Sequence, residues 1–138
     1  MSTVLIVDDD PDIRASLAEL VGLLLAARIV PGELTVATAA TGEEAVALAS
    51  GAKPVAVVVM DVNLPGIDGV EAFFRIAGAH GGKPVPTVFL TGYAGSGPLH
   101  ARLDITLAAG AVAVLGKPVS GAALLAAIER ALEVPITA

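Results

Sequence analysis

Five polar residues, each at the end of a short apolar run, carry side chains whose combined chemistry is distinctive: Asp8, Asp9, Asp61, Thr91 and Lys117. Three carboxylates brought together repel one another unless a cation or a shared proton compensates their charge. A divalent ion with oxygen ligands meets this need, and Mg²⁺ is the usual ion at phosphate-handling sites, with Mn²⁺ as an alternative. The lysine adds a positive charge that can meet an anionic oxygen, and the threonine adds a hydroxyl. This combination indicates phosphoryl transfer through an aspartyl phosphate.

These side chains can meet if the apolar runs form one parallel sheet, because the carboxyl ends of parallel strands share an edge where ligands bind. The hydrophobicity of the runs is continuous rather than alternating, as is typical of strands buried on both faces. Five strands are therefore predicted: Val4–Val7, Leu34–Ala39, Val55–Met60, Val85–Leu90 and Val112–Leu115.

Helices are predicted between and after these strands from apolar residues spaced three and four positions apart. The first begins at Pro11 and uses Ile13, Leu17, Leu20, Val21, Leu24 and Leu25; the others cover Ala45–Ala49, Val70–Ala77, about 99–109, and Leu124–Leu132. Asp10 and Asp12 are interpreted as helix-capping residues, and Asp68-Gly69 as a turn and helix start. The alternation predicts an α/β fold with helices on both faces of a doubly wound sheet.

The composition sets further bounds. The 138 residues suit one domain, and 55% hydrophobic with 16% charged residues excludes a disordered tail. A net charge of −6 argues against nucleic acid as a partner, and the absence of cysteine excludes disulfides and thiolate chemistry. Charged residues interrupt every apolar run before the roughly 20 residues that a membrane span requires. No basic leader precedes the first acids, so a cytoplasmic location is expected.

In its motifs the chain resembles the receiver domains of two-component response regulators, from about Val4 to Leu132. The resemblance rests on four segments in the right order: Leu5–Asp10, Met60–Gly69, Leu90–Gly92 and Gly116–Pro118. It implies a flavodoxin-like (CheY-like) sheet of order 2-1-3-4-5 and one receiver domain over residues 1–138, with no output domain in this chain. It also implies a histidine kinase or phosphotransfer protein as phosphate donor and an unknown downstream protein, with a homodimer left open.

Residue by residue, the resemblance makes Asp61 the phosphoacceptor and Thr91 and Lys117 its catalytic partners. Mg²⁺ would be held by Asp9 and Asp61 directly, by Asp8 through a water molecule, and by the backbone carbonyl of Asn63. The resemblance further implies a cis Lys117-Pro118 bond, hydrolysis of the phosphate at the same site, and no other enzymatic activity.

Two departures from the family pattern are visible. Val114 stands where the family often has an aromatic residue coupled to the threonine, so aromatic rotation cannot carry the signal here. The chain is also longer than usual around 26–34 and between Thr91 and Lys117. A phosphorylation-independent interaction module is therefore the alternative function, and a flavin carrier or a phosphohydrolase represents the enzyme class.

Other candidate sites are weaker. His80 and His100 have no acidic or histidine neighbours at ligand spacing and are interpreted as surface residues. The segment Gly81-Gly82-Lys83 fails as a phosphate loop, because it precedes a strand instead of following one. For Tyr93, control of water access to the phosphoryl group and a plain loop position are equally compatible with the sequence.

Overall fold

The computed structural model describes residues 2–26, 34–92 and 98–133, in which strands and helices alternate along the chain. The strands are β1 (Ser2–Val7), β2 (Leu34–Ala39), β3 (Val55–Asp61), β4 (Thr87–Thr91) and β5 (Ala113–Gly116). The helices are α1 (Pro11–Leu24), α2 (Gly42–Ala49), α3 (Gly69–Ala79), α4 (Pro98–Ala108) and α5 (Gly121–Glu133).

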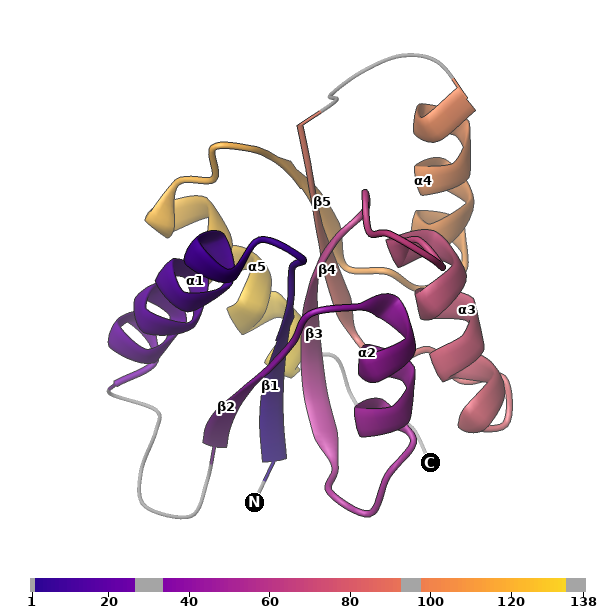
Figure 1. The fold of residues 1–138 in the computed structure, drawn as a ribbon, viewed down its shortest axis with the longest axis horizontal. Coiled ribbons are helices and arrows are strands. Elements are labelled where there is room, and N and C mark those ends of the chain that lie inside the picture. Colours follow the sequence, from indigo (N-terminus) through magenta and orange to yellow (C-terminus); the bar gives the residue numbers. More distant parts are fainter. Residues whose placement is uncertain (1, 27–33, 93–97, 134–138) are drawn as a thin grey trace.

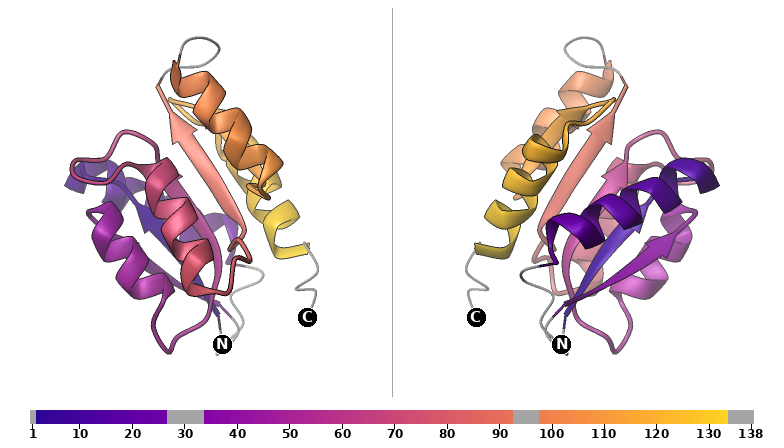
Figure 2. Two further views of the ribbon diagram at one scale, coloured as in Figure 1. Left: turned by 90° about the vertical axis from the view of Figure 1, so that its right-hand side faces the viewer. Right: turned by 90° about the vertical axis from the view of Figure 1, so that its left-hand side faces the viewer.

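The strands form one sheet of order β2-β1-β3-β4-β5, and all four neighbouring pairs are parallel. Helices α1 and α5 cover one face, while α2, α3 and α4 cover the other (Figures 1 and 2). This arrangement confirms the doubly wound fold and the strand order that the resemblance implied. No helix in the described ranges is long and apolar enough to cross a membrane.

Two separate hydrophobic cores follow from the alternation of side chains along the buried central strands. Leu5 and Val7 face the core beneath α2, α3 and α4, whereas Val4 and Ile6 face the core beneath α1 and α5. In the first core the Phe73 and Phe89 rings lie 5.7 Å apart. The continuous apolar runs in the sequence therefore reflect burial on both faces, as predicted.

Side chains cap the starts of four described helices, α1, α2, α3 and α5. Asp10 accepts from the backbone N–H groups of Asp12 (2.9 Å) and Ile13 (3.2 Å) at the start of α1. Thr41 accepts from Glu44 N–H (3.0 Å) at the start of α2. These bonds satisfy N–H groups that have no partner within the helix. The prediction that Asp10 caps the first helix is confirmed, whereas Asp12 lies inside the first turn.

Asp68 caps α3 and also contacts α4. One of its oxygens accepts from Glu71 N–H at 2.9 Å, and the other pairs with the Arg102 guanidinium at 2.7 Å. Although burial raises the pKa of Asp68, hydrogen bonds from Arg102 and Glu71 lower it below its ordinary value. A single carboxylate thus serves two helices.

The predicted boundaries need some corrections. Strand β4 begins at Thr87 rather than Val85, and it includes Thr91 because Thr91 pairs with Gly116 of β5. Helix α2 begins three residues earlier than predicted, at Gly42. Ile13 was expected on the buried face of the first helix but is 41% exposed, because it borders a surface pocket described below. The extra length expected around 26–34 falls largely outside the described residues.

The first residue of α3 packs directly on the backbone at the end of β3. Gly69 N–H donates to the carbonyl of Val62 at 2.9 Å. A Cβ atom at Gly69 would stand only 2.5 Å from the carbonyl oxygen of Asp61 and 3.0 Å from the Cα of Val62. Since both neighbours are backbone atoms, a side chain at this position forces the end of β3 to move.

We expect Gly69→Ala to lower the free energy of unfolding by about 1–3 kcal/mol, the usual cost of overpacking. Gly78→Ala is the matched control, because it lies in the same helix with open space around its Cβ position. There the higher helix propensity of alanine should stabilise by up to about 1 kcal/mol. Urea unfolding of both variants measures the difference, and equal effects at the two positions would contradict this account of Gly69.

Candidate functional site

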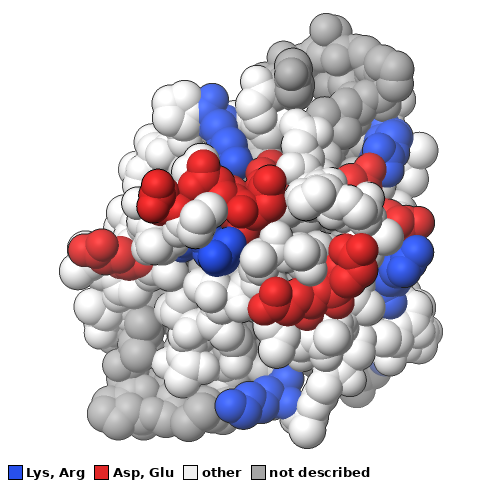
Figure 3. All heavy atoms as spheres, viewed as in Figure 1, with Lys and Arg blue, Asp and Glu red and all other residues white. Residues whose placement is uncertain are grey.

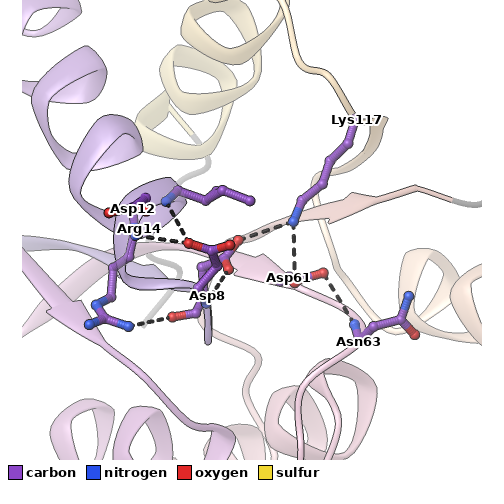
Figure 4. Close-up of polar contacts among 8 residues, drawn as sticks. Asp8, Asp12, Arg14, Asp61, Asn63 and Lys117 are labelled. Carbon is purple, nitrogen blue, oxygen red and sulfur yellow. Dashed lines mark hydrogen bonds and ion pairs between the residues drawn. The ribbon is translucent and has the colours of Figure 1, made fainter.

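The polar residues singled out in the sequence meet at one edge of the sheet. Asp8 follows β1, Asp61 ends β3, Thr91 ends β4 and Lys117 follows β5. Because the strands are parallel, these positions all lie at the carboxyl edge, and Figure 4 shows Asp8, Asp61 and Lys117 pointing toward one another. The predicted convergence is confirmed.

The acidic part of the site consists of three carboxylates with different exposure. Asp8 is 1% exposed and Asp61 is 7% exposed, whereas Asp9 is open to solvent. One carboxylate oxygen from each residue lies within 4.8 Å of the other two. The acidic atoms gather on the surface where α1 meets the sheet edge, with basic atoms beside them (Figure 3).

Lys117 partly compensates this negative charge. Its Nζ atom lies 3.0 Å from Oδ2 of Asp8 and 3.2 Å from Oδ2 of Asp61, so one ammonium group joins both buried carboxylates. The Lys117-Pro118 peptide bond is cis, as the resemblance implied. The backbone N–H of Lys117 donates to the carbonyl of Thr91 at 2.8 Å, which ties the lysine to the end of β4.

Backbone N–H groups hold the remaining carboxylate oxygens. Oδ1 of Asp8 accepts from Asp10 N–H at 2.9 Å, and Oδ1 of Asp61 accepts from Asn63 N–H at 3.2 Å. These bonds restrict the rotation of both buried carboxylates. They also place the backbone of Asn63 next to Asp61, on the side away from Lys117 (Figure 4).

Burial and charge shift two pKa values in the site. Burial raises the pKa of Asp61 above its ordinary value, against the opposing charge and hydrogen bond of Lys117. Burial lowers the pKa of Lys117, but the hydrogen bond to Asp8 and the charge of Asp61 raise it more. Lys117 is therefore fully charged at neutral pH, while ionisation of Asp61 is disfavoured by its surroundings.

The donor set suits a hard divalent cation. All three acidic side chains offer oxygen ligands, which Mg²⁺ and Mn²⁺ prefer. Three carboxylates facing one ammonium leave an excess of negative charge, and Asp9 opens the cluster to solvent. Asp8, Asp9 and Asp61 could therefore hold such an ion.

Comparison with known proteins decides the family. The family model for the response regulator receiver domain matches residues 4–129. The chain belongs to the receiver-domain family. The transcriptional regulatory protein PdtaR of Mycobacterium tuberculosis H37Rv is 37% identical over 129 residues, which cover 94% of this chain and 56% of that protein.

Two further relatives extend the comparison. The positive alginate biosynthesis regulatory protein of Pseudomonas aeruginosa is 37% identical over 90 residues, 65% of this chain and 33% of that protein. This receiver domain thus spans a third to about half the length of these curated relatives. The crystal structure of the receiver domain of sensor histidine kinase PA1611 from P. aeruginosa has 27% identity, with a TM-score of 0.76. It covers 95% of this chain and 97% of that one, and contains a magnesium ion in its active-site cleft.

Of the remaining sequence candidates, the described ones, His80 and the Gly81-Gly82 turn, fall outside the site. His80 is exposed, and its Nε2 atom donates to the carbonyl of Ala49 at 2.7 Å. Gly81 and Gly82 have positive φ angles in the turn between α3 and β4, at the opposite edge of the sheet. Tyr93 and the side chain of His100 lie outside the described residues.

Sequence reasoning missed two neighbours of the site. Arg14, in the first turn of α1, donates from its guanidinium to the backbone carbonyl of Asp8 at 2.9 Å. A pocket of about 550 Å³ between α1 and the segment after β5 adjoins Lys117, with Ile13 and Leu20 among its mostly apolar lining. The position of Arg14 six residues after Asp8 was visible in the sequence, but a contact to a backbone carbonyl leaves no residue pattern to detect.

In the absence of divalent ions we expect Asp61→Asn to raise the free energy of unfolding at pH 7. A raised pKa means that ionised Asp61 destabilises the folded state. This cost is absent below the ordinary pKa of 3.8, where the group is protonated in both states, and grows as pH rises through the folded pKa. Urea unfolding in EDTA from pH 7 toward pH 4 should show the advantage of the variant shrinking. A variant that is less stable at pH 7 contradicts the prediction.

Proposed function

We propose that this receiver domain accepts a phosphoryl group on Asp61 from a histidine kinase or phosphotransfer protein, in a Mg²⁺-dependent reaction. The observation that carries the proposal is the placement of Lys117, whose Nζ atom contacts the Asp61 carboxylate while Asp8 and Asp9 provide further oxygens beside it. Nucleophile, cation and metal ligands are thus combined at one sheet edge. Positioning and charge compensation are what phosphoryl transfer requires of a protein.

In the proposed reaction a carboxylate oxygen of Asp61 attacks the phosphorus of the donor. A bond from that oxygen to phosphorus forms, and the phosphorus–nitrogen bond to the donor histidine breaks, with its electron pair returning to the imidazole. Lys117, already 3.2 Å from Oδ2 of Asp61, pairs with the new phosphoryl oxygens. Attack of water on phosphorus later releases inorganic phosphate and restores the carboxylate.

The supporting residues have distinct roles in this proposal. Asp8, Asp9 and Asp61, with the backbone carbonyl of Asn63, would hold Mg²⁺, which when bound neutralises charge on phosphoryl oxygens. Asn63 N–H keeps one oxygen of Asp61 oriented. Thr91, buried at the end of β4, would donate its hydroxyl to the phosphoryl group.

Phosphorylation changes the charge that the sheet edge must accommodate. The aspartyl phosphate carries about two negative charges, where the ionised carboxylate of Asp61 carried one, and it places them farther from the backbone of β3. The group therefore shifts the equilibrium between surface conformations that a downstream protein distinguishes. Val114 is half-buried against the core beneath α4, so the response does not use an aromatic side chain at that position, and it starts at Thr91.

We expect incubation with acetyl phosphate and Mg²⁺ to add the mass of one phosphoryl group to the protein, measured by intact-mass spectrometry. Asp61→Asn and EDTA should each abolish the gain, since the first removes the nucleophile and the second the cation. Lys117→Gln should slow the gain at least about 100-fold, because it removes charge stabilisation of the transition state.

Asp12→Asn is the matched control, since it removes an exposed carboxylate from α1 outside the acidic cluster. It should be labelled like the wild type. Equal labelling of Asp61→Asn refutes Asp61 as the acceptor. An unlabelled wild type that also fails with every candidate kinase would favour the phosphorylation-independent interaction module.

A further inference from the structure

Arg14 contacts the acidic site from the side opposite to Lys117. Its guanidinium donates to the backbone carbonyl of Asp8, and the contact is partly buried. Figure 4 shows Arg14 reaching back from α1 to one side of Asp8 while Lys117 approaches from the other. A helix N-terminus carries partial positive charge, so a cation here is unfavourable unless local contacts compensate for it. The contact to Asp8 is such a compensation.

The bond from Arg14 completes the set of partners of Asp8. Asp8 N–H donates to Ala39 at 3.2 Å, and its carboxylate oxygens accept from Asp10 N–H and Lys117 Nζ. Its carbonyl lies beyond the last residue of β1 and accepts from the guanidinium of Arg14 at 2.9 Å. Arg14 therefore fixes the orientation of the peptide group that joins Asp8 to Asp9.

The orientation of the Asp9 carboxylate depends on this peptide group more than the orientations of the Asp8 and Asp61 carboxylates do. Within the described parts of the chain, no hydrogen bond or ion pair holds the carboxylate of Asp9, which is exposed. Nevertheless one of its oxygens lies within 4.8 Å of oxygens of Asp8 and Asp61. The direction of the Asp9 side chain thus depends on its backbone: Arg14 holds the peptide group before Asp9, and the Asp8 carboxylate holds the one after it.

We propose that Arg14 is a positioning residue: by holding the Asp8 carbonyl it aims the Asp9 carboxylate at the cation position shared with Asp8 and Asp61. This inference rests on the proposed function, in which those carboxylates bind Mg²⁺. A positioning role and a purely electrostatic role of Arg14 predict opposite changes in Mg²⁺ affinity when the side chain is removed. Loss of a positive charge near a cation site should tighten Mg²⁺ binding, whereas loss of positioning should weaken it.

The test compares Arg14→Met and Arg14→Lys with Arg75→Met. Methionine keeps an apolar stem without donor or charge, lysine keeps both, and Arg75 is a surface cation of α3 whose loss changes net charge equally. Two quantities are measured by NMR: the order parameter of the Asp9 amide in metal-free protein, and the dissociation constant for Mg²⁺ from a chemical-shift titration.

We expect Arg14→Met to lower the Asp9 order parameter and to raise the Mg²⁺ dissociation constant about 10-fold, as loss of an outer-shell partner typically does. Arg14→Lys should restore most of both values, and Arg75→Met should change neither. An unchanged Asp9 order parameter, or tighter Mg²⁺ binding, in Arg14→Met overturns the inference.

Two further outcomes, a variant that does not fold and a wild type that binds no Mg²⁺, can be distinguished from failure of the inference about Arg14. If Arg14→Met does not fold, as judged from the dispersion of its amide spectrum, the lysine variant and Arg14→Gln decide through the same two measurements. A wild-type protein that binds no Mg²⁺ refutes the metal in the proposed function. The Asp9 order parameter in the metal-free variants then still supports or overturns the control of Asp9 by Arg14.

Discussion

The organising constraint of this protein is electrostatic: buried carboxylates at the end of a sheet must be kept close without being neutralised by their own protons. Asp8 and Asp61 are almost fully buried, and a single ammonium group, that of Lys117, contacts both. Burial alone would favour the protonated acid, and it does raise the pKa of Asp61. The lysine and the backbone N–H groups compensate part of the negative charge, and the exposed Asp9 leaves the cluster open to solvent.

The acidic side chains are brought together and oriented largely by contacts that involve the backbone. Parallel strands bring the acids and the lysine to one edge from positions as far apart as Asp8 and Lys117. Gly69 lets α3 approach the carbonyl of Asp61 so closely that a methyl group has no room. Arg14 holds the carbonyl of Asp8. Contacts to the backbone of the acidic residues thus help to orient their side chains.

Much of this arrangement could be predicted from the sequence because its causes are local. Continuous apolar runs predicted strands buried on both faces, and the acids, threonine and lysine at their ends predicted the site. The edge strands agree less well with the prediction of burial on both faces, since only Leu34 and Ala39 of β2 are buried. Ile13 was misplaced because helical periodicity indicates a face but not whether another element fills the space beside it. Contacts of Arg14 and Arg102 escaped prediction, since they join a side chain to a backbone carbonyl or to a distant helix.

The double use of Asp68 has a mechanical consequence. Asp68 lies only seven residues after Asp61. One oxygen of its carboxylate caps the N-terminus of α3, and the other pairs with Arg102 of α4. Helix α4 otherwise contributes few buried side chains beyond Leu103 and Thr106 in the part of the chain described. Because one carboxylate contacts both helices, a displacement of the turn that follows β3 would move α3 and α4 together. This coupling requires no aromatic side chain on β5.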